Sequence, residues 1–316
     1  MNTLHEGVDE YVAMRRHLGY ALREPARALH QFAAFVASVG QSVITTELAL
    51  RWATQAAHVQ PATQAWRLGV VRRFAAWRRA TDPRTQVPPA GLLPARYRRT
   101  APYLYRDDQI AALLQAAEQL AGPHGLRGRT YATLFGLLAV TGLRLSEALH
   151  LNADDIGWDT SVLTIRHTKF GKSRLVPVHA STLQVLREYA DAKQRVPTAS
   201  RASAFFVSDR GTRLTGDMAR YTFAKVSRSI GLRGPVVAGR RRGRGPRLHD
   251  MRHRFAVQTL LNWYRAGADV EREIPKLATY LGHAHVNDTY WYLEAVPELL
   301  HLAAARLDRR CDGGWA

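Results

Sequence analysis

Apolar residues recur every three or four positions through much of the first eighty residues, which is the spacing of helices with one buried face. After Pro25 this pattern predicts a helix, and Thr45 or Thr46 is a suitable N-cap for a further helix reaching about His58. The first of these two helices would bury Leu29, Phe32, Phe35, Val36 and Val39. The start of the chain is therefore predicted to be helical, with short breaks.

Pro61 is predicted to begin another helix, because proline fits the first helical turn. Its apolar face would hold Trp66, Val70, Phe74 and Trp77. Most arginines of the segment fall elsewhere on the helix: Arg67, Arg72, Arg73, Arg78 and Arg79. A basic face opposite an apolar one is suited to docking on phosphates, and the alternative is an ordinary solvated face.

A change of composition marks a domain boundary. Residues 81–94 read T-D-P-R-T-Q-V-P-P-A-G-L-L-P, with four prolines and a glycine, which is typical of a linker. We place the boundary at residues 82–102. This predicts a helical first domain over residues 1–98 and a second domain over residues 99–316.

The second half begins with helical patterns at residues 107–120 and 130–140, followed by a break at Thr141-Gly142 and a shorter helix from about Ser146. The period then changes, because residues 162–167 and 174–178 are rich in β-formers. A glycine lies midway between these two strands, so the pair is predicted to be a β-hairpin.

The rest of the chain is again predicted to be helical. Ser181 with Gln184 forms a candidate capping box for a helix to about Lys193, and Asp217 is a candidate cap for another to about Ser229. Residues 240–247, R-R-R-G-R-G-P-R, are too rich in glycine for regular structure, and helices follow to about Arg309. The predicted fold is mainly α with a small β-sheet, in two domains.

Composition adds charge to this picture. The 316 residues suit two domains, and 45 Lys and Arg against 26 Asp and Glu give a formal net charge of +19. Such an excess favours a polyanionic partner, with nucleic acid ahead of acidic lipid or an acidic protein. A single cysteine, Cys311, excludes disulfides within the chain and Cys-based zinc sites, and suits a reducing cytoplasm. We expect neither a membrane span nor a signal peptide.

Two segments carry cations suited to phosphate chemistry. In T-G-L-R-L-S-E-A-L, Arg144 lies between a helix break and a helix start, where its guanidinium can bind phosphate with two parallel donors. The alternative is a surface ion pair with Glu147. On the hairpin, Lys169 and Lys172 can reach a DNA groove and donate a proton, although most hairpin lysines are only solvated.

Histidines and a tyrosine complete the set of reactive residues. In L-H-D-M-R-H-R-F-A, His249 and Arg252 share one helix face, which suits acid–base chemistry on a bound phosphate. His283 ends Y-L-G-H, and Tyr292 follows nine residues later in T-Y-W-Y-L. A tyrosine can act as a covalent nucleophile if a base and cations help its ionisation, and the alternative is a packed aromatic.

A metal site is a weaker alternative for the histidines. His253 and His285 could join His283 around a metal ion. No carboxylate or cysteine at metal-ligand spacing supports such a site.

The order of these segments resembles the tyrosine recombinase family, which includes phage integrases and Xer-type resolvases. The resemblance covers roughly residues 105–300, and the helical first domain is similar to the family's core-binding domain. It implies a nucleophile at Tyr292, phosphate-binding arginines at Arg144 and Arg252, and histidines at His249 and His283. The hairpin segment T-K-F-G-K-S-R-L-V-P-V aligns Lys169 with the family's catalytic lysine and leaves Lys172 outside it. Glu147 falls where the family often has an acidic support residue.

The resemblance also implies the reaction and its partners. DNA strands would be cut and rejoined through a 3′-phosphotyrosine, without metal, cofactor or ATP. The partners would be double-stranded DNA with specific recombination sites and further copies of the chain, as a tetramer on two duplexes. Sister recombinases or accessory proteins are further candidate partners, and the segment from about Pro297 is expected to pack on a neighbouring copy. Such an enzyme would serve a mobile element or phage in the bacterial cytoplasm, at the nucleoid.

Two features depart from the family pattern. Arg252 and His283 are further apart than usual, which predicts either longer helices or an insertion that contacts a partner. A basic run lies directly before His249 and contains Arg240, Arg241, Arg242 and Arg244. It is either a DNA-contacting loop or a disordered one. A type IB topoisomerase and a catalytically silent DNA-binding protein remain the alternative functions. The DNA target and the outcome, whether integration, excision, inversion or resolution, are not predicted.

Overall fold

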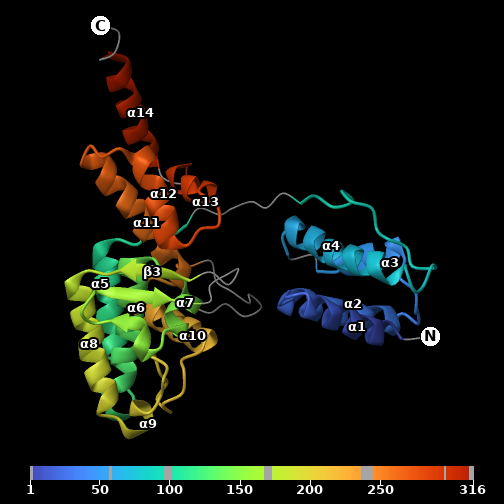
Figure 1. The fold of residues 1–316 in the computed structure, drawn as a ribbon, viewed down its shortest axis with the longest axis horizontal. Helices are drawn as coiled ribbons and strands as arrows, with labels where there is room; N and C mark the ends of the chain where they lie inside the picture. The colour runs from blue at the N-terminus through green and yellow to red at the C-terminus, as the bar shows by residue number, and fades with distance from the viewer. Residues whose placement is uncertain are drawn as a thin grey trace. The chain divides into compact units, whose positions relative to one another are not determined.

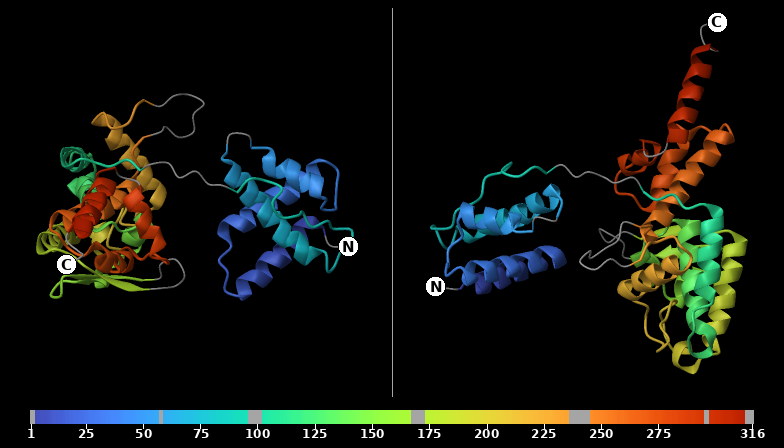
Figure 2. Two further views of the ribbon diagram at one scale, coloured as in Figure 1. Left: turned by 90° about the horizontal axis from the view of Figure 1, so that it is seen from above. Right: turned by 180° about the vertical axis from the view of Figure 1, so that it is seen from behind.

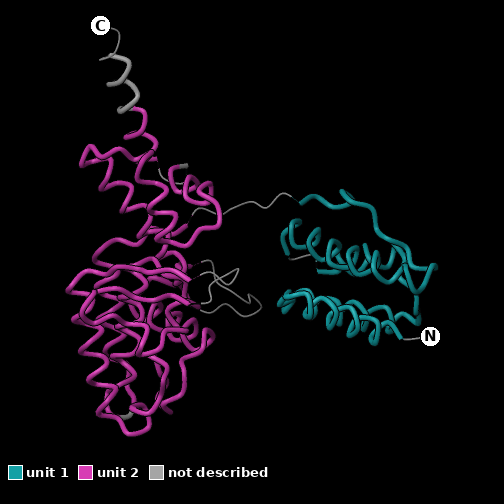
Figure 3. Tube along the Cα trace, viewed as in Figure 1, with its two compact units in different colours: residues 1–100 teal, residues 101–316 magenta. Residues whose placement is uncertain are grey.

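The computed structural model describes residues 3–56, 59–95, 102–166, 173–235, 245–294 and 297–312. The chain divides into two compact units, Met1–Thr100 and Ala101–Ala316 (Figure 3). Each unit has its own hydrophobic core. Within the described residues, no helix has the length and apolar character needed to cross a membrane.

The described part of unit 1 is helical (Figure 1). Its helices are α1 (Leu4–His17), α2 (Arg23–Ser38), α3 (Thr46–Thr54) and α4 (Pro61–Arg78). The predicted cap of α3 is confirmed, because the Thr45 hydroxyl accepts a hydrogen bond from the Leu48 amide at 3.1 Å. This helix ends at Thr54, earlier than predicted. Aromatic rings pack in two groups in this unit: Tyr11 contacts Phe74 and Trp77, and Phe32 lies edge-on to Trp52 at 5.3 Å.

Helix α4 packs largely as its sequence pattern predicts. Val70 and Phe74 are buried, but Trp66 is 42% exposed, so its assignment to the buried face was wrong. Arg78 was predicted to lie away from the apolar face, and this too is wrong because Arg78 is only 8% exposed. Its guanidinium lies against the backbone of Gly7 in α1, where any side chain would collide with it.

The proline-rich segment of residues 81–94 packs on unit 1. The Gln86 amide donates to the Ile44 carbonyl at 2.9 Å, and the Gln86 side chain accepts from the Thr46 amide at 2.9 Å. Val87 and Leu93 contact the core of the unit. These backbone bonds and apolar contacts give the segment a defined path over the helices.

Unit 2 is built around α6, a helix buried for most of its length. Leu134, Phe135 and Leu138 are at most 1% exposed, and α5, α8 and α11 pack around them. The helices of this unit are α5 (Asp107–Glu118), α6 (Leu126–Thr141), α7 (Leu145–His150), α8 (Ala180–Gln194), α9 (Pro197–Ser200), α10 (Gly216–Ser229), α11 (Leu248–Arg265), α12 (Val270–Leu281), α13 (Asn287–Glu294) and α14 (Pro297–Asp312), with short 3₁₀ turns η1 (Pro123–Gly125) and η2 (Ala153–Asp155).

A small antiparallel sheet lies on this helical core. Its order is β1 (Ile156–Gly157), β2 (Val162–Ile165) and β3 (Arg174–Pro177), which confirms the predicted hairpin and adds a strand that was not predicted. Leu163 pairs with Val176, and both are buried because alternate side chains face the helices. The connection between β2 and β3, which contains Lys169 and Lys172, lies outside the described residues.

Two predicted helix caps were wrong, each by a small offset. Helix α8 is capped by His179, whose Nδ1 accepts from the Ser181 amide, so Ser181 is not the cap. Helix α10 is capped by Thr215, whose hydroxyl accepts from the Met218 amide at 3.3 Å, and Asp217 lies inside the first turn. Each helix begins earlier than the predicted cap residue.

The last four helices form a smaller second core at one end of unit 2, opposite α9 (Figure 1, Figure 2). The core contains Ala256, Val257, Leu260, Leu261, Val270, Ile274, Leu277, Leu281, Tyr292 and Leu299. The long separation between Arg252 and His283 is occupied by the rest of α11, a short turn and the whole of α12. This segment is therefore helical over most of its length.

Candidate active site

Two glycines end helices beside the candidate site. Gly142 follows α6 with φ 61°, and Gly282 follows α12 with φ 67°, both in the left-handed region that glycine adopts at least cost. Each leaves a carbonyl that accepts a hydrogen bond from an arginine. Arg252 Nη1 donates to the Gly142 carbonyl and Arg144 Nη2 donates to the Gly282 carbonyl, both at 2.8 Å.

Arg144 is held by its own helix as well as by Gly282. It is the N-cap of α7, where its amide donates to Glu147 Oε2 at 2.9 Å and its Nη1 donates to Oε1 at 2.8 Å. The side chain remains 28% exposed. The ion pair with Glu147, considered above as an alternative to a functional role, therefore exists and also fixes the direction of the guanidinium.

Arg252 is buried at 2% exposure on α11. Its Nη2 donates to the Leu281 carbonyl at 2.7 Å, in addition to the bond with Gly142. Burial, followed by repulsion from Arg144, lowers the pKa of Arg252 to about 10. The guanidinium thus stays charged at neutral pH, and two cations lie close enough to repel each other, as expected of a site for an anion.

Glu147 is the buried anion that balances this charge. Burial alone would raise its pKa, but hydrogen bonds and charge from Arg174 and then Arg144 hold the pKa at about 2. Arg174 donates through Nη1 and Nη2 to the two carboxylate oxygens at 3.0 and 2.9 Å. Arg174 opens the R-L-V-P segment of the predicted hairpin but was not among the predicted site residues.

His283 follows the glycine cap of α12 and is partly buried. Its Nδ1 lies 2.7 Å from the Thr289 hydroxyl, so Nε2 is the ring nitrogen that can bond a bound phosphate. Burial, and then the positive charges of Arg252 and Arg144, lower the pKa of His283 to about 4. The imidazole is therefore neutral at pH 7.

Tyr292 lies on α13 at 3% exposure, whereas Tyr290 is 41% exposed. The Tyr292 ring is stacked beside the His283 ring, with centroids 6.0 Å apart. Burial raises the pKa of Tyr292, and the charge and hydrogen bond of Arg252 act in the opposite direction. Of the two tyrosines in T-Y-W-Y-L, Tyr292 is the one that lies beside the arginine and the histidine.

His249 and His253 lie one helical turn apart on α11, with ring centroids 4.8 Å apart. Burial and the charge of Arg252 lower the pKa of His249. The His253 ring packs on Tyr292 with centroids 5.5 Å apart, and its pKa is lowered to about 3, first by burial and then by His249. Within the described residues, no group of three or more His, Cys, Asp or Glu side chains is placed to hold a metal ion, and His285 is exposed.

The structure describes only some of the residues that were predicted to contact DNA. Lys169 and Lys172 lie outside the described residues, and so do the arginines of the basic run before α11, which are Arg240, Arg241, Arg242 and Arg244. On α4, Arg73 is exposed and Arg72 is half-buried, and Arg79, which follows the helix, is exposed. Arg67 is also half-buried, with its guanidinium 4.1 Å from the centroid of the Trp52 ring.

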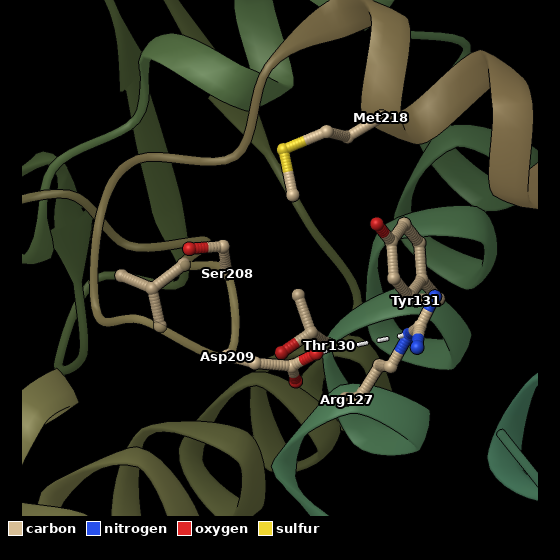
Figure 4. A pocket seen from close by; sticks show the side chains of 7 residues that line it. Arg127, Thr130, Tyr131, Ser208, Asp209 and Met218 are labelled. Atoms are coloured by element: carbon tan, nitrogen blue, oxygen red, sulfur yellow. Dashed lines mark ion pairs between the residues drawn. The ribbon is translucent and has the colours of Figure 1, made fainter. Parts of the chain in front are cut away.

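A small pocket lies apart from this cluster, beside the N-terminal half of α6 and the start of α10 (Figure 4). An ion pair between Arg127 and Asp209, 3.9 Å apart, crosses its rim. It is lined by Arg127, Thr130, Tyr131, Val207, Ser208, Asp209 and Met218. Thr130 and Gly142 are separated by about 18 Å along α6, at ~1.5 Å per residue, so the pocket is not part of the candidate site.

Comparisons with known proteins agree with this arrangement. Residues 104–298 match the phage integrase family. The protein named "Putative integrase/recombinase y4rB" of Sinorhizobium fredii is 52% identical over 317 residues, covering 99% of both chains. Tyrosine recombinase XerC of Mycobacterium tuberculosis is 32% identical over 324 residues, covering 97% of this chain and 96% of its own.

Solved structures show the same fold at lower identity. The Tn1549 transposon integrase in complex with transposon right end DNA has a TM-score of 0.65 at 15% identity, covering 98% of this chain and 99% of its own. A lambda integrase tetramer bound to a Holliday junction has a TM-score of 0.59 at 17% identity, covering 90% and 78%. With a matching family domain and relatives of 52% and 32% identity over nearly the full length, the chain belongs to the phage integrase family of tyrosine recombinases.

Proposed function

We propose that this protein is a site-specific DNA recombinase that cuts and rejoins strands through a 3′-phosphotyrosine on Tyr292. The observation that carries the proposal is the meeting of Arg144, Arg252, His283 and Tyr292, which come from four separate elements. A protein that only binds DNA has no need of a tyrosine buried between an arginine and a histidine.

The two guanidinium groups of the site, Arg144 and Arg252, are suited to binding a DNA phosphodiester. The diester carries one negative charge and gains a second in the pentacoordinate transition state, so fixed donors that face the non-bridging oxygens stabilise the transition state more than the ground state. We assign this role to Arg144 and Arg252, with Nε2 of His283 as a third donor. Their bonds to the glycine carbonyls and to Glu147 hold the guanidinium groups in place before DNA arrives.

Proton transfers complete the cleavage step. The Tyr292 oxygen bonds to phosphorus while its proton passes to His249, which is neutral at pH 7 because its pKa is lowered. The bond to the 5′-oxygen breaks, and Lys169 gives that oxygen a proton. A well-placed acid or base contributes ~10²–10⁴ in rate. The phosphotyrosyl bond retains the energy of the diester, so the reverse attack by a 5′-hydroxyl needs no ATP.

Strand exchange requires a second DNA site. The 5′-hydroxyl of a partner strand replaces the original one, so two duplexes and four copies of the chain form the reacting complex. The tetrameric lambda integrase, which shares the fold, was solved on a Holliday junction. We further propose that α14 packs on a neighbouring copy and that the enzyme works at the nucleoid for a mobile element or phage.

Unit 1 is proposed to be the core-binding domain, corresponding to residues 1–98. Arg72 and Arg73 of α4 and Arg79 directly after it are accessible to DNA phosphates, whereas the burial of Arg78 removes it from this role. Arg67 can contribute only through its exposed edge, since it is stacked on Trp52.

Trapping of the covalent intermediate tests the proposed function. Duplexes that tile the DNA flanking the gene, each nicked close to one possible cleavage position, would release the short 5′-hydroxyl fragment and prevent rejoining. A recombinase gives an adduct that survives denaturation, and a silent DNA-binding protein gives none. Exchange of strands between two such duplexes separates a recombinase from a type IB topoisomerase, which relaxes supercoiled DNA without a partner site.

A further inference from the structure

Arg174, the first residue of β3, carries a buried guanidinium that the proposed mechanism does not use. Its side chain is 11% exposed. It donates to both carboxylate oxygens of Glu147, and its Nε donates to the Tyr280 carbonyl at 2.8 Å. One side chain of the hairpin thus reaches both α7, through Glu147, and the end of α12.

The end of α12 is shaped around this guanidinium. A Cβ on Gly282 would lie 2.6 Å from Arg174 Nη1 and 2.8 Å from Cζ, so the glycine backbone lies directly against the arginine. The carbonyl of the same glycine accepts from Arg144. The Tyr280 hydroxyl donates to the Pro177 carbonyl at 3.2 Å, which ties the other end of β3 to α12. The contact between strand and helix is therefore made at both ends of β3.

Glu147 has no spare acceptor for a substitute partner. Its Oε1 accepts from Nη1 of Arg144 at 2.8 Å and from Nη1 of Arg174 at 3.0 Å. Its Oε2 accepts from the Arg144 amide and from Nη2 of Arg174, both at 2.9 Å. Removal of Arg174 would leave half of a buried carboxylate unpaired, and such a group draws in water or rotates toward its remaining partner.

We propose that Arg174 is a positioning residue for the recombination reaction. It sets the direction of Arg144 through Glu147 and holds the Gly282 turn, from which His283 follows, so that arginine and histidine face one phosphate. This proposal rests on the proposed function. It also means that β3, which follows the segment containing Lys169 in the sequence, is held to the phosphate site by Arg174.

Lysine cannot replace this arginine. Its ammonium is one compact charge, whereas the contacts of Arg174 need two parallel donors to a carboxylate and a third donor to a carbonyl. Arg174→Lys keeps the charge beside Glu147 and loses this geometry. A displacement of about 1 Å at a reacting group costs ~10²-fold in rate, which is the size of effect expected.

The experiment compares Arg174→Lys and Arg174→Met with wild type and with Arg166→Ala. Arg166 follows β2 of the same hairpin, is 55% exposed, and pairs with the buried Asp155 rather than with Glu147, so it is a matched control. The readout is the single-turnover rate constant of adduct formation on nicked duplex, with enzyme in excess. A variant that only folds poorly lowers the amplitude of this reaction, while a positioning residue lowers its rate constant.

We expect Arg174→Lys to keep its unfolding midpoint and DNA affinity near the wild-type values and to lose ~10²-fold in rate constant. Arg174→Met should be at least as slow, and Arg166→Ala should stay within about twofold of wild type. Substrates with a 5′-bridging oxygen or sulfur should show the same defect, because Arg174 acts on phosphate binding and not on the leaving group.

Two results would overturn the proposal. One is a wild-type rate constant in Arg174→Lys and Arg174→Met. The other is recovery on the sulfur substrate, which would assign Arg174 to the placement of the hairpin lysine. If wild type itself gives no adduct with Tyr292, the proposed function fails and this inference fails with it.

Discussion

The ring of Tyr292 lies nearly parallel to the imidazole of His283, with 22° between their planes and 6.0 Å between their centroids. Thr289, three residues earlier on α13, is buried and bonds His283 Nδ1. Residues three apart share a helix face, so one face of α13 meets the histidine, while Tyr290 faces solvent. This register of α13 selects Tyr292 as the proposed nucleophile.

Replacement of each tyrosine separately tests this register. Tyr292→Phe should bind DNA normally and form no covalent adduct, because only the hydroxyl is removed. Tyr290→Phe is the matched control and should form adduct at the wild-type rate. Denaturing gels of the trapped complex measure both. Adduct in Tyr292→Phe together with none in Tyr290→Phe would show that the register is wrong.

The general acid can be identified by changing the leaving group. Lys169→Ala should slow cleavage by ~10²–10⁴ on an ordinary substrate, since the departing 5′-oxygen needs a proton. A 5′-bridging sulfur leaves without one, so cleavage of that substrate should be nearly as fast as in wild type. Equal defects on both substrates would reject this role, and sulfur rescue in Lys172→Ala would transfer it to Lys172.

The basic run before α11 is predicted to contact DNA phosphates. The variant to test replaces four arginines by alanine at once: Arg240, Arg241, Arg242 and Arg244. It should bind DNA more weakly than wild type at moderate salt. Each lost phosphate contact lowers the salt slope of log K by ~0.9, so the slope should flatten by up to ~3.6. Preference among DNA sequences should change little, because phosphate contacts read no base edge. Titrations across a range of salt concentrations measure this, and an unchanged slope would exclude these residues from the interface.

Stability should fall as the pH drops below about 6.5, the ordinary pKa of histidine. Burial lowers the pKa of His253 to about 3 and that of His283 to about 4 in the folded protein. Between these values and 6.5 the unfolded chain binds protons that the folded chain does not, so acid favours unfolding. Each such histidine contributes at most about 1.4 kcal/mol per pH unit to the slope.

Denaturant unfolding of the full chain at pH 7.5 and 5.5 checks this expectation. His253→Phe keeps an aromatic ring against Tyr292 and removes one titrating group, so its stability should depend less on pH than that of wild type. His285→Phe is the control, because His285 is exposed. An identical pH dependence in wild type and His253→Phe would contradict the prediction.

Local physical chemistry explains what the sequence determined by itself. Helical and strand periods depend on neighbours a few residues apart, so the predicted helices and the hairpin are present with shifted ends. The shifts at Ser181 and Asp217 arose because a nearby His179 or Thr215 also offers a side-chain acceptor. The spacing of Arg144 and Glu147 likewise fixed their contact, since a capping interaction lies within a single turn.

Contacts between distant segments were decided only by the tertiary structure. Arg144 and Gly282 are separated by 138 residues, and Arg174 and Tyr280 by 106. The spacing of residues along the chain does not predict which backbone carbonyl a guanidinium group will hydrogen-bond at such separations. The same holds for Arg78, which belongs to the polar face of α4 by spacing and is buried because α1 packs over it. The chemical groups of the site can therefore be read along the chain, but the residues that aim them depend on how the helices pack.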